Sequence, residues 1–163
     1  ASDITRTFPV NGRFSPPQKE IYEIVLDAQK QAIASIMPGE DVNKPHEIVC
    51  EIITRGLMKL GIMEDVSNLR EFYMHGTGHW LGLDVHDVGT KESGNLFREF
   101  QVGMVTTVEP GIYIRKDDKI DPKYWNIGIR IEDDVLVTID GNHVLSAAAI
   151  KNIDDIELLM SHR

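Results

Sequence analysis

The chain has 163 residues, of which 42% are hydrophobic, so it can bury one sizeable core and is expected to form a single domain over residues 1–163. Its 26 acidic and 17 basic residues give a net charge of −9, which opposes binding to the phosphate backbone of nucleic acids. The single cysteine, Cys50, permits no internal disulfide, and neither a signal peptide nor a membrane span is evident, so we expect a cytoplasmic protein without a membrane partner.

Residues 1–10 alternate between polar and apolar side chains, which predicts a strand that ends in a tight hairpin turn at Asn11-Gly12. In such a strand Asp3 lies on a polar face together with Thr5 and Thr7. Because this strand begins without a lead-in, we expect the chain to be part of a longer protein.

Two helices are predicted next. Ser15 is a suitable N-cap, prolines fit the first turn, and apolar residues recur at helical spacing as far as Ile36. A second helix is predicted from Pro45 to Gly61, and Cys50 lies in its apolar stretch as a small core residue. The apolar stripes of both helices are expected to face the core.

The second half of the chain is predicted to be rich in strands. Residues 88–103 contain many Gly, Lys and Glu residues and are interpreted as a loop or irregular arm. Strands are expected at residues 104–108, 112–114 and 127–138, and a short amphipathic helix at residues 153–160. Two long helices followed by clustered strands indicate an α+β fold.

Three histidines lie within twelve residues, in the motif His75-Gly-Thr-Gly-His79 and at His86. The glycines break a helix, so this is not the helical His-Glu-x-x-His zinc motif; they instead allow close approach of the backbone to a ligand or strand. With Asp84 and Asp87 beside them, these histidines are expected to reach one cleft. The remaining histidines lack such a setting and are expected at the surface: His46, His143 and His162.

Two glutamates are candidates for the same cleft. Glu109 follows a predicted strand and precedes Pro-Gly, a position typical of functional side chains, although an ordinary turn glutamate would have the same setting. In the predicted strand at residues 127–138, Arg130 and Glu132 point away from a face of isoleucines. A surface ion pair between Arg130 and Glu132 is the alternative interpretation of these two residues.

Carboxylates combined with one or two imidazoles favour manganese, or cobalt, iron or zinc in its place, over copper or a thiolate-bound metal. Two such ions close together would lower the pKa of a shared water and polarise a carbonyl, which is the chemistry of metal-assisted amide hydrolysis. The residues by themselves therefore predict a metal-dependent hydrolase.

Several motifs, in this order, resemble those of the pita-bread metallopeptidases of family M24, which include methionine aminopeptidase, prolidase and aminopeptidase P. They are Ser2-Asp-Ile-Thr-Arg-Thr-Phe-Pro-Val-Asn-Gly12, the segment from Met74 to Gly89, Val108-Glu-Pro-Gly111 and Gly128-Ile-Arg-Ile-Glu-Asp-Asp134. The motifs are most similar to those of bacterial Xaa-Pro aminopeptidases. The resemblance implies a pita-bread fold, with a curved, mainly antiparallel sheet and helices packed on one side.

The resemblance also implies a metal centre. Asp3 and Glu132 would bridge two divalent metal ions, most readily Mn²⁺, and His79 and Glu109 would complete the coordination of one ion. The family has a further metal-binding aspartate upstream of the position of Asp3, so the second site is expected to lack a ligand in this chain. We therefore expect residues 1–163 to be most of a catalytic domain without its first part, with uncertain activity by themselves.

The implied reaction releases the N-terminal residue from a peptide with proline at the second position, by attack of a metal-bridging hydroxide. His75, His86 and Glu109 are the implied catalytic residues: the histidines line the cleft and Glu109 also transfers a proton to the leaving nitrogen. Tyr113 and Arg130 would contact the substrate or orient the carboxylates. The full-length protein is expected to be a homo-oligomer that binds proline-containing peptides.

Two alternative functions remain open. Prolidase shares the metal ligands and differs mainly in accepting Xaa-Pro dipeptides. A pita-bread module that has lost catalysis and binds proteins is the second alternative, although such modules usually lack several of the ligands that this chain contains.

Overall fold

The computed structural model describes residues 2–93 and 96–161. Its helices are α1 (Pro16–Ala34), α2 (Lys44–Lys59), the short α3 (Leu69–Phe72) and α4 (Ile153–Ser161), with 3-10 turns at Val66–Asn68 and Pro122–Tyr124. Its strands are β1 (Glu92–Ser93), β2 (Leu96–Phe97), β3 (Val105–Val108), β4 (Gly111–Ile114), β5 (Ile127–Arg130), β6 (Asp133–Thr138) and β7 (Gly141–Val144).

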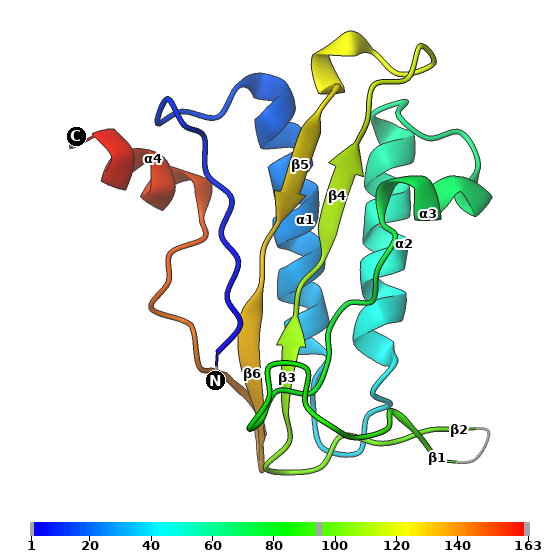
Figure 1. Ribbon diagram of the computed structural model, residues 1–163, viewed down its shortest axis with the longest axis vertical. Coiled ribbons are helices and arrows are strands. Elements are labelled where there is room, and N and C mark those ends of the chain that lie inside the picture. Colours follow the sequence, from blue (N-terminus) through cyan, green and yellow to red (C-terminus); the bar gives the residue numbers. More distant parts are fainter. Residues whose placement is uncertain (1, 94–95, 162–163) are drawn as a thin grey trace.

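Helix α1 begins where the sequence predicts it, because the Ser15 backbone N–H donates to Gln18 Oε1 at 2.9 Å and prolines fill the first turn. Helices α1 and α2 lie side by side on one side of the strands (Figure 1). Gly56 of α2 permits this approach, since a Cβ there would lie 2.8 Å from the Ile24 side chain.

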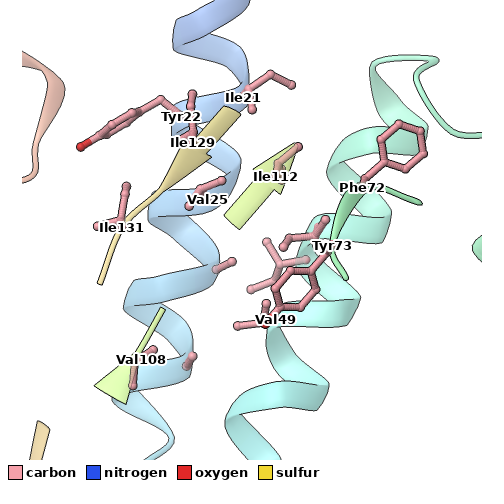
Figure 2. Packing of buried hydrophobic residues seen from close by; sticks show 14 of the residues in the cluster. Ile21, Tyr22, Val25, Val49, Phe72, Tyr73, Val108, Ile112, Ile129 and Ile131 are labelled. Carbon is pink, nitrogen blue, oxygen red and sulfur yellow. The ribbon is translucent and has the colours of Figure 1, made fainter. Parts of the chain in front are cut away.

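The core lies between these two helices and the strands (Figure 2). Apolar side chains of α1 and α2, such as Val25 and Val49, are fully buried together with Ile112 of β4 and Ile131. Burial of each large aliphatic side chain stabilises the fold by about 1.5–3 kcal/mol. This packed layer of helices and core side chains covers one face of the strands (Figure 1).

All pairings between the strands are antiparallel: β3 with β6, β6 with β7, β4 with β5, and β1 with β2. The chain leaves β3 at residue 108 and resumes in β4 at 111, while β5 ends at 130 and β6 starts at 133. Because Val108 pairs with Asp133 and Gly111 with Arg130, the two interruptions lie opposite each other. We call residues 109–110 and 131–132 the sheet break.

The predicted α+β fold with helices on one side is confirmed, whereas the strand predicted at residues 127–138 is divided in two by the sheet break. The strand predicted at residues 1–10 is wrong for the described residues 2–9, which lie beside β5 and β6 without forming a ladder. The reason is that Thr7 Oγ1 takes the place of a backbone partner: it donates to Arg130 O at 2.9 Å and accepts from Arg130 N at 3.1 Å.

The turn predicted at Asn11-Gly12 exists, with Gly12 N donating to Pro9 O at 3.0 Å and Gly12 at a φ of 83°, but it leads into α1 instead of a hairpin. The arm at residues 88–103 is largely irregular as predicted, although it contains the β1–β2 ribbon; residues 94 and 95 lie outside the described part. Strand β7 and helix α3 were not predicted. Within the described residues, no helix combines the length and apolar character that crossing a membrane requires.

Candidate metal centre

The sheet break is where the predicted site residues meet. Glu109 and Glu132 each lie in one of its two halves, and two other segments insert there. Residues 2–9 lie along the β5–β6 side, where Glu132 N donates to Thr5 O at 3.1 Å. The segment at residues 75–79 lies along the other side, where Glu109 N donates to Thr77 O at 2.7 Å. The interruption thus gives both segments the hydrogen bonds that a continuous ladder would use.

Gly78 places His79 against β3. A Cβ at position 78 would lie only 1.9 Å from Thr107 O, so glycine is required at this close approach. His79 N donates to Thr107 Oγ1 at 3.0 Å, and Thr107 N donates to His79 O at 3.0 Å. The predicted close approach of the backbone to a neighbouring strand is therefore confirmed at Gly78, whereas a Cβ at Gly76 would meet only Gly78 O, at 4.0 Å.

The imidazole of His79 is oriented by its own neighbours. Nδ1 lies 3.0 Å from Trp80 O, and because a carbonyl only accepts, Nδ1 carries the hydrogen. In the neutral ring the lone pair is then on Nε2, which lies 3.1 Å from Asp3 Oδ2 and 3.6 Å from Glu109 Oε1. A lone pair and two carboxylates that face one another are the arrangement a divalent cation would hold together.

Two overlapping groups of side chains bring potential ligand atoms within 4.8 Å of one another. The first contains Asp3, His79 and His86, and the second contains His79, Glu109 and Glu132. The four residues predicted as metal ligands therefore meet at one place, with His79 shared between the groups.

Glu132 is the most deeply buried of these carboxylates, at 2% exposure. Its pKa is raised to about 6, mainly by burial and also by the neighbouring Glu109 and Asp3 carboxylates, while the hydrogen bond from Thr5 Oγ1, at 2.5 Å, opposes the change. Among the described residues, Arg130 is the one lysine or arginine that pairs with these three carboxyl groups, at 3.7 Å from Glu109, so a cation would stabilise the site. The alternative interpretation, a surface ion pair between Glu132 and Arg130, does not describe this buried side chain.

Arg130 and Tyr113 join Glu109 to His75. Arg130 Nη1 lies 3.7 Å from Glu109 Oε2, and its Nε donates to the Tyr113 hydroxyl at 2.7 Å. His75 Nδ1 lies 2.7 Å from Gly76 O and therefore donates, which leaves Nε2 to accept from the Tyr113 hydroxyl at 2.8 Å. Burial raises the pKa of Tyr113, so the hydroxyl stays protonated for this hydrogen bond.

His86 lies at the open side of the cluster. Its side chain is exposed, and its ring centroid is 4.2 Å from that of His79 in an edge-on arrangement. The aspartates beside it do not join the cluster: Asp84 is exposed, and Asp87 accepts from the backbone N–H groups of Leu83 and Val88, at 3.1 and 2.8 Å. Asp87 thereby shapes the loop that presents His86.

His46 was expected at the surface, and this is wrong. It is half-buried, and its Nδ1 lies 2.8 Å from Thr77 Oγ1, which also lies 2.7 Å from the Tyr73 hydroxyl. Burial lowers the pKa of His46, and the nearby Lys91 charge lowers it further. Cys50 is likewise half-buried instead of deep in the core, with Sγ 3.5 Å from His46 Nε2.

The hydrogen bonds of Thr77 with His46 and Tyr73 support the 75–79 segment, since Thr77 lies between His75 and His79 in the sequence. The sequence carried one signal of them: His46 occurs in the first turn of an amphipathic helix whose apolar stripe is buried. Of the other histidines expected at the surface, His143 is exposed, and His162 lies outside the described residues.

The sequence matches the family model for metallopeptidase family M24 over residues 1–139. Among curated proteins, the chain is 54% identical to the Xaa-Pro aminopeptidase of Haemophilus influenzae, over 99% of the chain and 39% of that protein. It is 47% identical to the Xaa-Pro aminopeptidase of Escherichia coli, over 98% of the chain and 38% of that protein. The chain thus spans about two fifths of the length of these relatives.

Solved structures similar to this chain are also aminopeptidases. The fold superposes on aminopeptidase PepP of Pseudomonas aeruginosa with a TM-score of 0.95 and 51% identity, covering 99% of this chain and 38% of that one. Zinc-substituted Escherichia coli aminopeptidase P in complex with product gives a TM-score of 0.91 at 47% identity, covering 98% of this chain and 38% of that one.

Proposed function

The chain belongs to metallopeptidase family M24, and from this premise we propose that it forms the metal-binding side of an Xaa-Pro aminopeptidase active site. Such an enzyme releases the N-terminal residue of a peptide whose second residue is proline. The α+β arrangement is the pita-bread fold of the aminopeptidase P structures, as predicted from the sequence. The observation that carries the proposal is the meeting of His79 with three carboxyl groups at the sheet break.

Asp3, His79, Glu109 and Glu132 are the residues proposed to hold divalent cations, with the carboxylates of Asp3 and Glu132 shared between two ions. Bound cations would supply the Lewis acidity that polarises the scissile carbonyl and lowers the pKa of water. The donor set, oxygen with one or two imidazoles, supports Mn²⁺ as the proposed metal, with Co²⁺, Fe²⁺ or Zn²⁺ able to replace it. A relative has been solved in a zinc-substituted form.

Glu109 is proposed to accept a proton from the attacking water and deliver it to the proline nitrogen as the peptide bond breaks. Its position supports this role, since Oε1 faces His79 Nε2 while Oε2 faces Arg130. The Arg130 guanidinium holds the second oxygen in place, so one oxygen remains directed to the reacting atoms.

His75 and His86 are proposed to line the cleft and donate hydrogen bonds to the polarised carbonyl oxygen. His86 is exposed and free to turn toward a substrate, whereas His75 already bonds Gly76 and Tyr113. His75 Nδ1 therefore donates to a substrate only if the substrate displaces Gly76 O, and Tyr113 and Arg130 set the orientation of the ring.

The proposal is tested by measuring Mn²⁺-dependent cleavage of an Xaa-Pro-Xaa tripeptide beside an Xaa-Pro dipeptide. Both this chain and a version extended at its N-terminus to the length of its relatives are assayed, with Glu109→Gln as the inactive control. We expect the extended version to cleave the tripeptide. The cleavage rate should fall roughly 10²- to 10⁴-fold in Glu109→Gln, which is the usual contribution of a general acid–base group.

Preference for the dipeptide would favour prolidase instead. Absence of cleavage of both peptides by the extended protein, in the presence of metal, would contradict the peptidase proposal and favour a protein-binding module.

A further inference from the structure

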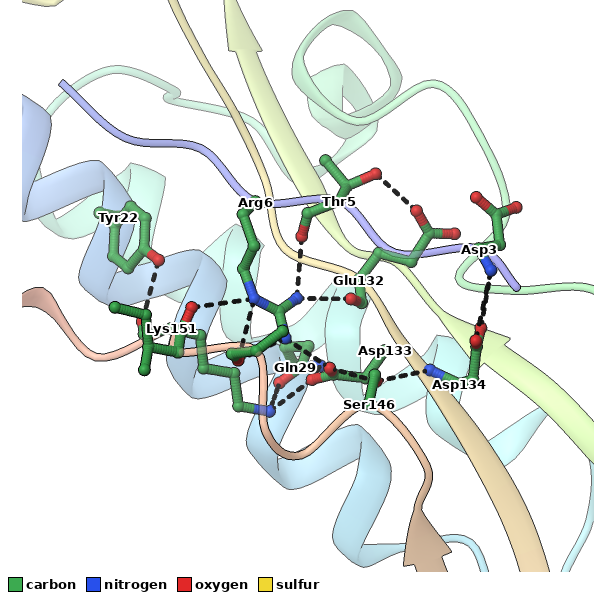
Figure 3. A network of polar contacts seen from close by, with 12 residues as sticks. Asp3, Thr5, Arg6, Tyr22, Gln29, Glu132, Asp133, Asp134, Ser146 and Lys151 are labelled. Carbon is green, nitrogen blue, oxygen red and sulfur yellow. Dashed lines mark hydrogen bonds and ion pairs between the residues drawn. The ribbon is translucent and has the colours of Figure 1, made fainter. Parts of the chain in front are cut away.

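Arg6 connects three separate segments of the chain, although it lies outside the group of proposed ligands (Figure 3). Its Nη1 donates to Thr5 O at 2.9 Å and to Glu132 O at 2.6 Å. Its Nη2 donates to Asp133 Oδ1 at 2.7 Å and to Ala149 O at 2.8 Å. The Nε atom donates to Ile150 O at 3.0 Å. One guanidinium thus joins the N-terminal segment, the sheet break and the turn before α4.

The geometry of these contacts requires arginine. A guanidinium has five N–H donors in a rigid plane, and the contacts of Arg6 use donors on all three nitrogens. A lysine ammonium has three donors on a single atom, so it retains the charge but reaches only part of this set. The Arg6 side chain is 15% exposed, and its carboxylate partner Asp133 is fully buried.

The partner of Arg6 is itself fixed. Asp133 Oδ2 accepts from Lys151 Nζ and from Gln29 Nε2, each at 2.6 Å, and Oδ1 also accepts from Ser146 Oγ at 2.6 Å. Asp133 therefore anchors Arg6 to α1 and to the C-terminal region, and Arg6 transfers this rigidity to the segment that contains Asp3.

The N-terminal segment has other attachments beside Arg6: Asp3 N donates to Asp134 Oδ2 at 3.2 Å, and Thr5 Oγ1 donates to Glu132 Oε2 at 2.5 Å. Within the described residues, one backbone-to-backbone hydrogen bond joins it to the sheet break, from Glu132 N to Thr5 O. Arg6 donates to the carbonyl groups of the same two residues, and it lies three positions after Asp3. Arg6 therefore adds a rigid link between the backbones of Thr5 and Glu132, beside the contacts that Asp3 N and Thr5 Oγ1 make.

We infer that Arg6 is a positioning residue of the proposed metal centre: it fixes the spacing of Asp3 and Glu132 and so increases cation affinity without contacting a cation. The inference rests on the proposed function, since it needs these carboxylates to be ligands. Residues that hold metal ligands in place typically change metal affinity by about 10- to 100-fold when replaced.

The test uses Arg6→Lys and Arg6→Met, with Lys151→Met as a matched control. Lys151 also bonds Asp133, so its replacement disturbs the same buried carboxylate without touching Thr5 or Glu132. Mn²⁺ affinity is measured by titration calorimetry well below the Tm of each variant. We expect affinity to fall roughly 10-fold or more in both Arg6 variants and to change less than about twofold in the control.

A second readout needs no metal. Hydrogen exchange of the Glu132 amide, which donates to Thr5 O, is expected to accelerate in Arg6→Lys and to stay unchanged in Lys151→Met. If the Glu132 amide exchange rate and the Mn²⁺ affinity are both unchanged in Arg6→Lys, the inference is overturned. An equal loss of Mn²⁺ affinity in Lys151→Met would also overturn it. Failure of the unsubstituted chain to bind Mn²⁺ would instead contradict the metal centre itself and remove the basis of the inference.

Discussion

At the scale of single residues, the carboxyl group of Glu132 lowers the stability of the metal-free fold when it is ionised, because it is buried beside other carboxyl groups. Its pKa is raised to about 6 by burial and by the nearby acidic groups, so the folded chain favours the protonated form. A group with a raised pKa in the folded state stabilises the protein at low pH and loses that contribution as pH rises. Metal-free chain is therefore expected to become less stable through this group between about pH 4.5 and 6.

Glu132→Gln should remove this pH dependence. We expect the difference in unfolding free energy between pH 4.5 and pH 7 to shrink by on the order of 2 kcal/mol in the metal-free variant, as measured by urea unfolding. The same substitution should strongly weaken Mn²⁺ binding. An unchanged pH profile would contradict the raised pKa, and unchanged Mn²⁺ affinity would contradict the role of Glu132 as a ligand.

Thr77 is a second residue whose role is local. Its hydroxyl lies between His46 and Tyr73, and its side chain is 5% exposed. Thr77→Val should destabilise the chain by about 1–3 kcal/mol, because the buried Tyr73 and the half-buried His46 each lose a hydrogen bond. Thr90→Val, at an exposed position, is the control and should change the unfolding free energy little. If the two substitutions change the unfolding free energy equally, the hydrogen bonds of Thr77 do not stabilise the fold.

At the scale of elements, the site depends on how closely the 75–79 segment approaches β3. Gly78→Ala introduces a Cβ that would lie 1.9 Å from Thr107 O, so the segment must move and carry His79 with it. We expect a loss of about 1–3 kcal/mol of stability, as for other overpacked sites, and weaker Mn²⁺ binding.

Gly76→Ala is the matched control for this prediction. It lies two positions earlier in the same segment, and its added Cβ would meet only Gly78 O, at 4.0 Å. Thermal unfolding and calorimetric Mn²⁺ titration of both variants distinguish them. If Gly78→Ala and Gly76→Ala have the same Tm and the same Mn²⁺ affinity, the close approach of Gly78 to β3 does not position His79.

Periodicity and turn residues were enough to predict the elements that form this framework. Apolar spacing predicted α1 and α2, and alternation predicted that Ile131 and Glu132 point in different directions: Ile131 packs in the apolar core, whereas Glu132 lies with His79 and Glu109. The sheet break was not predicted, although the run Glu132-Asp133-Asp134 interrupts the alternation within residues 127–138, because a run of polar residues alone does not show where a strand ends. It results from contacts with Thr5 and Thr7, which are distant in sequence.

At the scale of the whole molecule, the buried network around Asp133 joins Arg6 of the N-terminal segment and Lys151, before α4, to Gln29 of helix α1. Burial alone would raise the pKa of Asp133, but hydrogen bonds from Lys151, Ser146, Arg6 and Gln29 together lower it. A carboxyl group with a lowered pKa stabilises the fold above its unfolded pKa and loses that contribution as pH falls through the folded value. The network should therefore weaken in acid.

Asp133→Asn should destabilise the chain by about 3–5 kcal/mol at neutral pH, because it leaves Arg6 and Lys151 without their shared charge. Asp121→Asn is the control, since its ion pair with Lys123, at 3.5 Å, is about half exposed. That control should change stability by at most about 1 kcal/mol. Chemical denaturation at pH 7 and pH 3 measures both, and a small effect of Asp133→Asn would contradict the anchoring role of the network.

The resemblance of motifs implied four metal ligands, and the folded chain brings these four side chains together, whereas the sequence did not indicate the contacts of Arg6 and His46. Both act on backbone groups or buried hydroxyls from segments far away in sequence, so no local pattern marks them. Residue types with metal-binding chemistry can be recognised from spacing, whereas the residues that hold them in place are recognised only after the chain is folded.

The central claim is that Asp3, His79, Glu109 and Glu132 form one cation site. The most direct test is an anomalous difference map from crystals of the chain grown with Mn²⁺. We predict a manganese peak within coordination distance of His79 Nε2 and of the surrounding carboxylate oxygens. A map from Mn²⁺-containing crystals with no peak among these four side chains, or with peaks only elsewhere, would contradict it.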